Sequence, residues 1–324
     1  MLYLTFHDNL NQIPPISISE EDNFRCIILF AYRKFKLILV EVFKSVYAHF
    51  LDNIDLFNKN KFDDRNMFNC VLRASFAKTI EFNYYLHHKA TKDEGFFFTP
   101  VLRGICEDII VLKFISDNIR PKHNELISLM TGLELTKNIE AQDKFFTKNR
   151  PYQPVVRQNE YGHKSNYQSK IKGLINSLGI KGDKMPPVEQ MAMKVGLSEV
   201  YEFLYRASSN FVHFNPAVLL RFGWKKFEEE KYSYSTKNFH EYYFFFSKIY
   251  GSYLFSLFAK EFKKVLSIKG DFLSNVKILD KELNNMLTWY ELVTFEELNL
   301  KRPSEILTVM NKVILENEAK KNVK

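Results

Sequence analysis

The sequence predicts an all-α fold, a multi-helix bundle, on three observations. Glycine and proline are scarce, with 11 and 10 residues in a chain of 324, against average usage of about 7% and 5%. A long chain with few turn-forming residues favours long elements, which are usually helices. Apolar residues recur at helical spacing, and no alternation of apolar and polar residues is long enough to predict a strand.

Four helices are predicted in the first half of the chain, after an extended arm over residues 1–18. Ser19 and the three acidic residues after it have the composition of a helix start, because a hydroxyl caps the first turn and acids favour its positive end. Thr99 followed by Pro100 predicts another start, since proline is favoured at the first helical position. The four helices are expected to cover residues 19–56, 68–80 with their flanks, 99–120 and 122–146. The second has a buried stripe of Phe68, Leu72, Phe76 and Ile80.

The second half of the chain is predicted to contain six more helices. Asn215-Pro216 ends the third of them, and a charged loop follows over residues 224–234. The helices are expected near residues 165–178, 187–195, 198–214, 239–265, 273–287 and 303–318. The very aromatic helix over 239–265 has the apolar spacing of a core or a dimer interface, although its aromatic rings could also stack on bases.

Residues 148–184 differ in composition from the rest of the chain. They are strongly basic, with interleaved tyrosines and several glycines and prolines. Clustered positive charge and stacking rings suit RNA, and the candidate contacts are Lys164, Lys170, Lys172 and Tyr167. A solvated loop with no ligand is the alternative interpretation.

The composition limits partners and location. The net charge of +8 and the pI of about 9.1 permit a polyanionic partner, although codon bias toward Lys, Asn, Ile, Phe and Tyr is an equal explanation. Three distant cysteines, Cys26, Cys70 and Cys106, match neither a zinc site nor a disulfide framework. We find no signal peptide, no membrane-spanning segment and no cofactor motif, so a cytoplasmic protein without a cofactor is expected.

Arg206 and His213 form the strongest candidate site. Seven residues make almost two helical turns, so the two side chains share a face with Asn210. A histidine moves protons near neutral pH, and an arginine stabilises a developing phosphorane anion. The pattern therefore suits cleavage of a phosphodiester without a metal. A surface arginine beside a hydrogen-bonded histidine is the structural alternative.

Arg103 and Glu107 form a second pair, four residues apart on one helical face. If that face meets the Arg206 helix, Glu107 can orient Arg206 or His213, and Arg103 adds positive charge. Asp108 points elsewhere on the helix and is the weaker candidate. The alternative is an ordinary ion pair between Arg103 and Glu107.

With these two helices in this order, the sequence resembles the HEPN superfamily of small helical RNases. The resemblance rests on Arg206 and His213 with six residues between them, Asn210 inside the motif, and the upstream helix with Arg103 and Glu107. It departs from many active members in having Ala207 directly after the arginine. It implies a metal-independent endoribonuclease, a toxin or anti-phage defence effector, that leaves a 2′,3′-cyclic phosphate.

The resemblance also implies a domain organisation and partners. A HEPN-like core over residues 65–225, with the basic insertion at 148–184, lies between an N-terminal arm and helix over 1–64 and a C-terminal helical extension over 226–324. A homodimer with a composite cleft and an antitoxin or sensor partner are implied as well. The alternative is a non-catalytic helical regulator that binds RNA or protein within a defence or toxin–antitoxin complex.

The remaining histidines have weaker claims. His87 and His88 are adjacent, but neighbouring residues on a helix point about 100° apart and chelate one metal poorly. His49 and His240 lie in apolar, aromatic patterns and are expected to be interior histidines. No metal site is therefore predicted.

Overall fold

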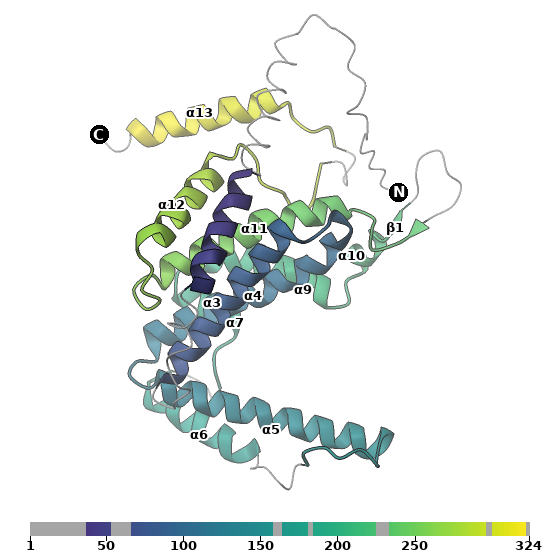
Figure 1. The fold of residues 1–324 in the computed structure, drawn as a ribbon, viewed down its shortest axis with the longest axis vertical. Helices are drawn as coiled ribbons and strands as arrows, with labels where there is room; N and C mark the ends of the chain where they lie inside the picture. The colour runs from purple at the N-terminus through teal and green to yellow at the C-terminus, as the bar shows by residue number, and fades with distance from the viewer. Residues whose placement is uncertain are drawn as a thin grey trace, which may run out of the picture. The chain divides into compact units, whose positions relative to one another are not determined.

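The computed structural model describes residues 37–52, 66–157, 164–180, 184–224, 233–295 and 300–321 (Figure 1). Helices dominate these ranges, which confirms the all-α class. The chain divides into two compact units. The first consists of Met1–Phe50, Thr79–Arg103 and Arg206–Lys324, and the second of Leu51–Lys78 and Gly104–Tyr205. The units are interleaved along the chain, whereas the predicted segments follow one another in sequence.

The first unit is built around α11 (His240–Glu261), which is buried on nearly all sides. A helix that is apolar all round belongs inside a core. The aromatic run at its start therefore packs internally, which agrees with the predicted core packing and not with base stacking. Phe43, from the helix over residues 37–52, places its ring edge against Phe255 of α11 at 5.2 Å. Phe255 also contacts Phe272 of α12 (Gly270–Asn285).

The helices α3 (Met67–His88) and α4 (Gly95–Asn118) contribute to both units, and the unit boundaries fall inside them. In the first unit, the buried Asn83 of α3 donates to the carbonyl of Gly251 in α11 at 3.1 Å. Thr99 of α4 and Ser247 of α11 pair through their buried hydroxyls at 3.3 Å. These two hydrogen bonds favour one position of α3 and of α4 along α11, because buried polar groups must be paired.

The first unit is completed by short elements and a C-terminal helix. They are α9 (Arg206–Val212), α10 (Pro216–Leu220), the two-residue strands β1 (Gly223–Trp224) and β2 (Ser233–Tyr234), and α13 (Glu305–Lys321). The strands pair antiparallel within the region predicted to be a charged loop. The structure also separates α10 from the preceding helix at Asn215, whose side chain caps α10.

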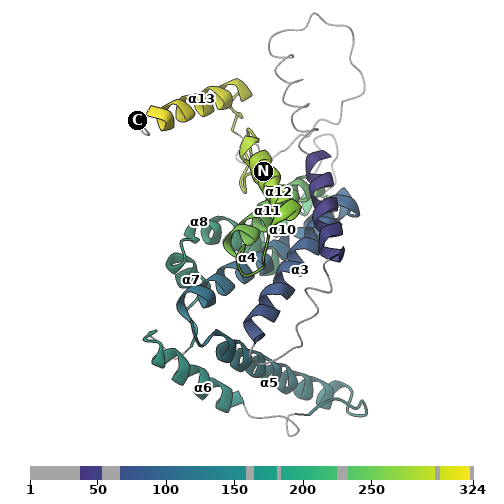
Figure 2. The same cartoon turned by 60° about the vertical axis from the view of Figure 1, so that its left-hand side comes forward.

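The second unit contains the long helix α5 (His123–Asn149) and α6 (Lys164–Ser177), which lie side by side in both views (Figures 1 and 2). Tyr167 of α6 packs on Gly132 of α5 so closely that a Cβ there would lie 2.3 Å from the ring. The unit continues with α7 (Val188–Lys194), α8 (Ser198–Val200) and the π-helical turn η4 (Tyr201–Tyr205).

Most predicted helices are confirmed to within a few residues, and one start is wrong. The buried stripe of α3 is confirmed, because all four of its members are at most 4% exposed. The helix predicted to begin at Thr99 begins at Gly95 instead, after a 3-10 turn (Lys92–Glu94) in which Thr91 and Glu94 form the capping box. Thr99 is therefore a buried core residue and not a cap. The predicted arm over residues 1–18 lies outside the described residues.

Candidate functional site

Three of the predicted catalytic residues form an exposed strip on α9. Arg206, Asn210 and His213 are all exposed, and we call them the α9 strip. His213 follows the last residue of α9, but its N–H still donates to the carbonyl of Ser209 at 3.0 Å. The helical path therefore continues to His213, and the three side chains share a direction.

The opposite side of α9 explains this exposure. Ala207 and Ser208 are buried, and Phe211 contacts Tyr243 of α11 at 5.1 Å and Phe96 of α4 at 6.0 Å between ring centroids. The apolar side of α9 is thus held by the core of the first unit. The strip is left to face solvent, where an arginine and a histidine can reach a ligand.

Arg103 joins the strip from a different part of the chain. Its Nε donates to Ser209 Oγ at 3.0 Å, across 106 positions of sequence. Ser209 lies three residues after Arg206 and four before His213, so it borders the strip on the helix surface. The structure therefore brings a second guanidinium group to α9.

Glu107 and Asp108 lie further along α4, in the second unit. Glu107 is half-buried, and its charge adds to burial in raising the pKa of the Cys106 thiol to about 12. Asp108 accepts hydrogen bonds from Ser75 Oγ at 2.6 Å and Lys78 Nζ at 2.5 Å. Asp108 is thus engaged in a local network, in agreement with its place as the weaker candidate.

The predicted RNA contacts on α6 have different surroundings. Lys164 pairs with Glu140 at 3.6 Å, and the half-buried ring of Tyr167 is packed on Gly132. Lys172 is exposed. Residues 158–163 of the basic segment lie outside the described residues.

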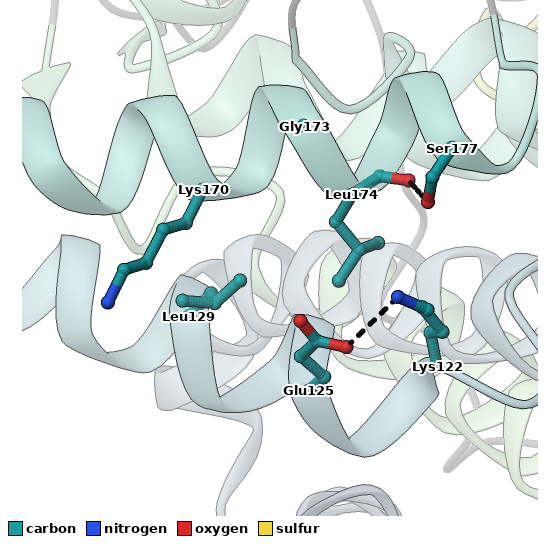
Figure 3. A pocket seen from close by; sticks show the side chains of 7 residues that line it. All are labelled: Lys122, Glu125, Leu129, Lys170, Gly173, Leu174 and Ser177. Carbon is teal, nitrogen blue, oxygen red and sulfur yellow. Dashed lines mark hydrogen bonds and ion pairs between the residues drawn. The ribbon is translucent and has the colours of Figure 1, made fainter.

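Lys170 borders a groove of about 480 Å³ between α5 and α6 (Figure 3). The groove is open and mixed in character, because Leu129 and Leu174 face it together with charged groups. Lys122 and Glu125 pair with each other across 3.6 Å on the α5 side. It contains none of the residues of the α9 strip.

His87, one of the histidines considered less favourable as site residues, has a structural role in the core. His87 is buried, stacks on Phe43 with 4.8 Å between ring centroids, and places Nε2 3.1 Å from Ser252 Oγ. Burial, and then the nearby Lys248 and His88, lower its pKa well below the usual value. Among the described residues, no group of three or more His, Cys, Asp or Glu side chains could hold a metal ion.

Two other histidines were expected in the interior, and neither is buried. His49 is exposed, with its ring edge near Phe272. Its helix is amphipathic, and the aromatic pattern around it did not distinguish the two faces. His240 is half-buried and lies 3.7 Å from Asp93.

Two features of this region could not be predicted from the sequence. Ser209 gave no signal, because a serine within a helix has no distinguishing pattern and its partner Arg103 is remote. The second feature is a set of exposed apolar residues close together in the sequence around the end of the strip, which we call the 212–220 patch. It consists of Val212, Phe214, Leu219 and Leu220.

Comparison with known proteins gives one family. Residues 98–232 match the model of DUF5677, a family of unknown function. The matched range contains all five candidate catalytic residues, with Arg103 and Glu107 near its start and the α9 strip toward its end. No curated protein and no solved structure matches the chain. Across the part of the chain that the structure describes, no helix is both long and apolar enough to span a membrane.

Proposed function

We propose that this protein is a metal-independent endoribonuclease of the HEPN kind that acts as a toxin or an anti-phage defence effector. The observation that carries the proposal is the α9 strip. An arginine, an amide and a histidine are exposed together on a helix whose other side is buried, and Arg103 is bonded to the same helix at Ser209. A histidine and an arginine can supply the proton transfer and charge stabilisation that phosphodiester cleavage needs.

The chemistry assigns a role to each residue. Cleavage removes the proton of the 2′-hydroxyl, forms a bond from that oxygen to phosphorus, and breaks the bond from phosphorus to the 5′-oxygen, which takes up a proton. His213 moves these protons, and Arg206 stabilises the charge on the phosphorane oxygens. Asn210 orients these two groups, and Arg103 holds the phosphate. The orienting role of Glu107 stays a prediction from the sequence alone. The products are a 2′,3′-cyclic phosphate and a free 5′-hydroxyl.

The proposal includes a second copy of the chain. Protons move at two oxygens on opposite sides of phosphorus, and each α9 strip supplies one imidazole. Two strips facing one another in a homodimer would supply both. Lys164, Lys170, Lys172 and Tyr167 remain the proposed contacts to the rest of the RNA. A toxic nuclease of this kind works in the cytoplasm and needs an antitoxin or sensor protein to keep it silent.

The test is expression of the wild type beside His213→Ala and Arg206→Ala in growing cells. We expect growth arrest and RNA fragmentation with the wild type alone, and cleavage by the purified protein that continues in EDTA. Fragments should end in a 2′,3′-cyclic phosphate, detected by its resistance to phosphatase until acid opens the ring. Arrest that survives both substitutions, or cleavage that stops in EDTA, would contradict the proposal.

A second function is a non-catalytic regulator that binds RNA or protein. The 212–220 patch favours it, since several large apolar side chains exposed within one short stretch can belong to a binding surface. It predicts RNA or protein binding without any fragmentation, and binding that is unchanged by His213→Ala.

A further inference from the structure

Tyr243 of α11 contacts the segment that carries the α9 strip at two separate points. Its ring packs against Phe211 of α9, with 5.1 Å between the ring centroids and 85° between the ring planes. Its hydroxyl accepts a long hydrogen bond from Nη1 of Arg221, the residue that follows α10, at 3.5 Å. A single side chain that is only 1% exposed therefore contacts the chain on both sides of His213.

The Arg221 guanidinium group has a second partner. Its Nη2 donates to the carbonyl of Leu292 at 3.0 Å, and the residue is half-buried. A guanidinium group is planar and its donors point in fixed directions, so the position of one nitrogen limits where the other can lie. The end of α10 is thus bonded both to α11 and to the chain that follows α12. Both of these partners lie outside the range that the family model matches.

A group of aromatic rings surrounds the Tyr243 ring at α9. Phe96 of α4 contacts Phe211 at 6.0 Å and Tyr243 at 6.2 Å between ring centroids, so the three rings meet one another. Phe96 also packs edge-on against Phe222, the residue after Arg221, at 4.8 Å. Aromatic pairs prefer such tilted and edge-on arrangements. A rotation or shift of α9 would therefore disturb several contacts at once.

The proposed chemistry depends on where the α9 strip lies. His213 has to reach an oxygen of the substrate, and Arg206 has to reach the phosphorane oxygens, so a displacement of about 1 Å can cost about 100-fold in rate. The strip is exposed, and the core packs against the opposite side of α9. The position of the strip is therefore set from that buried side, where Phe211 meets Tyr243.

We propose that Tyr243 and Arg221 are positioning residues for the α9 strip. The Tyr243 ring fixes α9 through Phe211, and its hydroxyl, through Arg221, fixes the end of α10 and joins both to the chain at Leu292. Neither residue touches the reacting atoms in this proposal, and both act through the placement of the strip. The inference rests on the proposed ribonuclease function.

The first test measures hydrogen exchange of the backbone amides in residues 206–221 by mass spectrometry. Tyr243→Phe removes the hydroxyl and keeps the ring. Exchange in this segment is expected to rise about 5- to 10-fold, because one hydrogen bond that restrains it is lost. Arg221→Lys keeps the charge but not the two-armed group, so it should have the same effect.

Tyr250→Phe is the matched control. Tyr250 is a second buried tyrosine of α11, seven residues further along, and its hydroxyl donates to the carbonyl of Tyr290 at 2.6 Å. Its loss also removes one hydrogen bond from the core, so a general loss of stability would appear in both variants. Exchange in residues 206–221 should stay at the wild-type value in this control.

The second test measures cleavage of a short RNA that carries a fluorophore and a quencher. Tyr243→Phe is expected to lower kcat about 10-fold and to leave KM within about twofold, since binding is kept and placement is lost. Tyr250→Phe should cleave as the wild type does. The double variant Arg221→Lys with Tyr243→Phe should be no worse than either single variant, because both changes break the same contact.

Three results would overturn the inference. One is exchange in residues 206–221 that is the same in Tyr243→Phe and the wild type, or that rises as much in Tyr250→Phe. Another is faster exchange without any fall in kcat. The third is full additivity of Arg221→Lys and Tyr243→Phe, because the two residues would then act independently.

This inference and the ribonuclease function can fail separately. If the wild type cleaves RNA and Tyr243→Phe changes neither exchange nor kcat, only the positioning role fails. If the wild type never cleaves, the ribonuclease function fails, and hydrogen exchange alone decides whether Tyr243 and Arg221 fix the position of α9.

Discussion

Arg206, Asn210 and His213 share a direction because of helix geometry, and they are exposed because of what the other side of α9 buries. The spacing of four and three residues was enough to predict the first property. The second depends on Phe211, which packs on Tyr243 and Phe96. At the scale of single residues, the spacing of a motif therefore sets how its side chains point relative to one another. Packing of the helix on the core decides whether those side chains are exposed to solvent.

His87 shows the opposite case, a histidine whose surroundings oppose protonation. It is buried against Phe43 and Ser252, and Lys248 of α11 and His88 of its own helix face it. Because its folded pKa lies below the unfolded value, the unfolded chain binds more protons as the pH falls below about 6.5. Its contribution to stability is complete above that pH and is lost as the pH falls toward the folded pKa.

We expect the free energy of unfolding to fall between pH 7.5 and 5.5, with His87 contributing at most about 1.4 kcal/mol per pH unit. His87→Gln keeps a polar group near Ser252 but does not titrate, so the fall should be smaller in this variant. Urea unfolding at the two pH values measures both. An equal fall in the two proteins would show that His87 does not carry the effect, and that His88 and His123, whose pKa values are also lowered by burial, account for it.

At the scale of elements, close helix approach depends on glycines that the pattern of apolar residues does not reveal. Gly95 starts α4 against the backbone of α11, where a Cβ would lie 2.0 Å from the carbonyl oxygen of His240. Gly173 lies within α6, where a Cβ would meet nothing within 4 Å. Both glycines lie in helices of the structure, but only Gly95 is required by packing.

Gly95→Ala and Gly173→Ala should therefore change stability in opposite directions. The first forces two backbones apart and is expected to lower the free energy of unfolding by about 1–3 kcal/mol. The second removes backbone freedom from the unfolded chain and should raise it by about 0.5–1 kcal/mol. Urea denaturation of both variants tests this, and a gain in stability for Gly95→Ala would contradict the close contact between α4 and α11.

At the scale of the whole molecule, positive charge is widespread. The cations that contact RNA must therefore be distinguished from those that only form ion pairs within the protein. The chain carries 46 lysines and arginines against 38 acids. Many of the cations lie in local ion pairs, such as Arg302 with Glu291 at 2.7 Å. Only cations that touch phosphate change the number of counterions released on RNA binding.

The salt dependence of RNA binding should identify such a cation. In the His213→Ala background, adding Arg206→Ala is expected to reduce the slope of log affinity against log salt by about 0.7 for a single strand. Adding Arg302→Ala instead should leave the slope unchanged, since Arg302 is paired within its own segment. Equal slopes for all three proteins would mean that Arg206 makes no phosphate contact.

The helices and the candidate residues could be predicted to different extents. Periodicity located α3, α5, α6 and α11, because each must bury an apolar face and so repeats apolar residues at helical spacing. The start of α4 was misplaced, because Thr99-Pro100 has the local chemistry of a start but Thr99 pairs with Ser247 in the core. A local signal was overridden by a tertiary contact.

The sequence by itself determined the helical class and the alignment of Arg206, Asn210 and His213, since both follow from spacings along one stretch of chain. Only the tertiary structure decided which side of α9 is buried, that Arg103 reaches Ser209 from 106 positions away, and that Phe214, the residue after His213, is exposed. The physical reason is that a helix sets directions among its own residues, whereas burial and remote hydrogen bonds depend on which other segments pack against it.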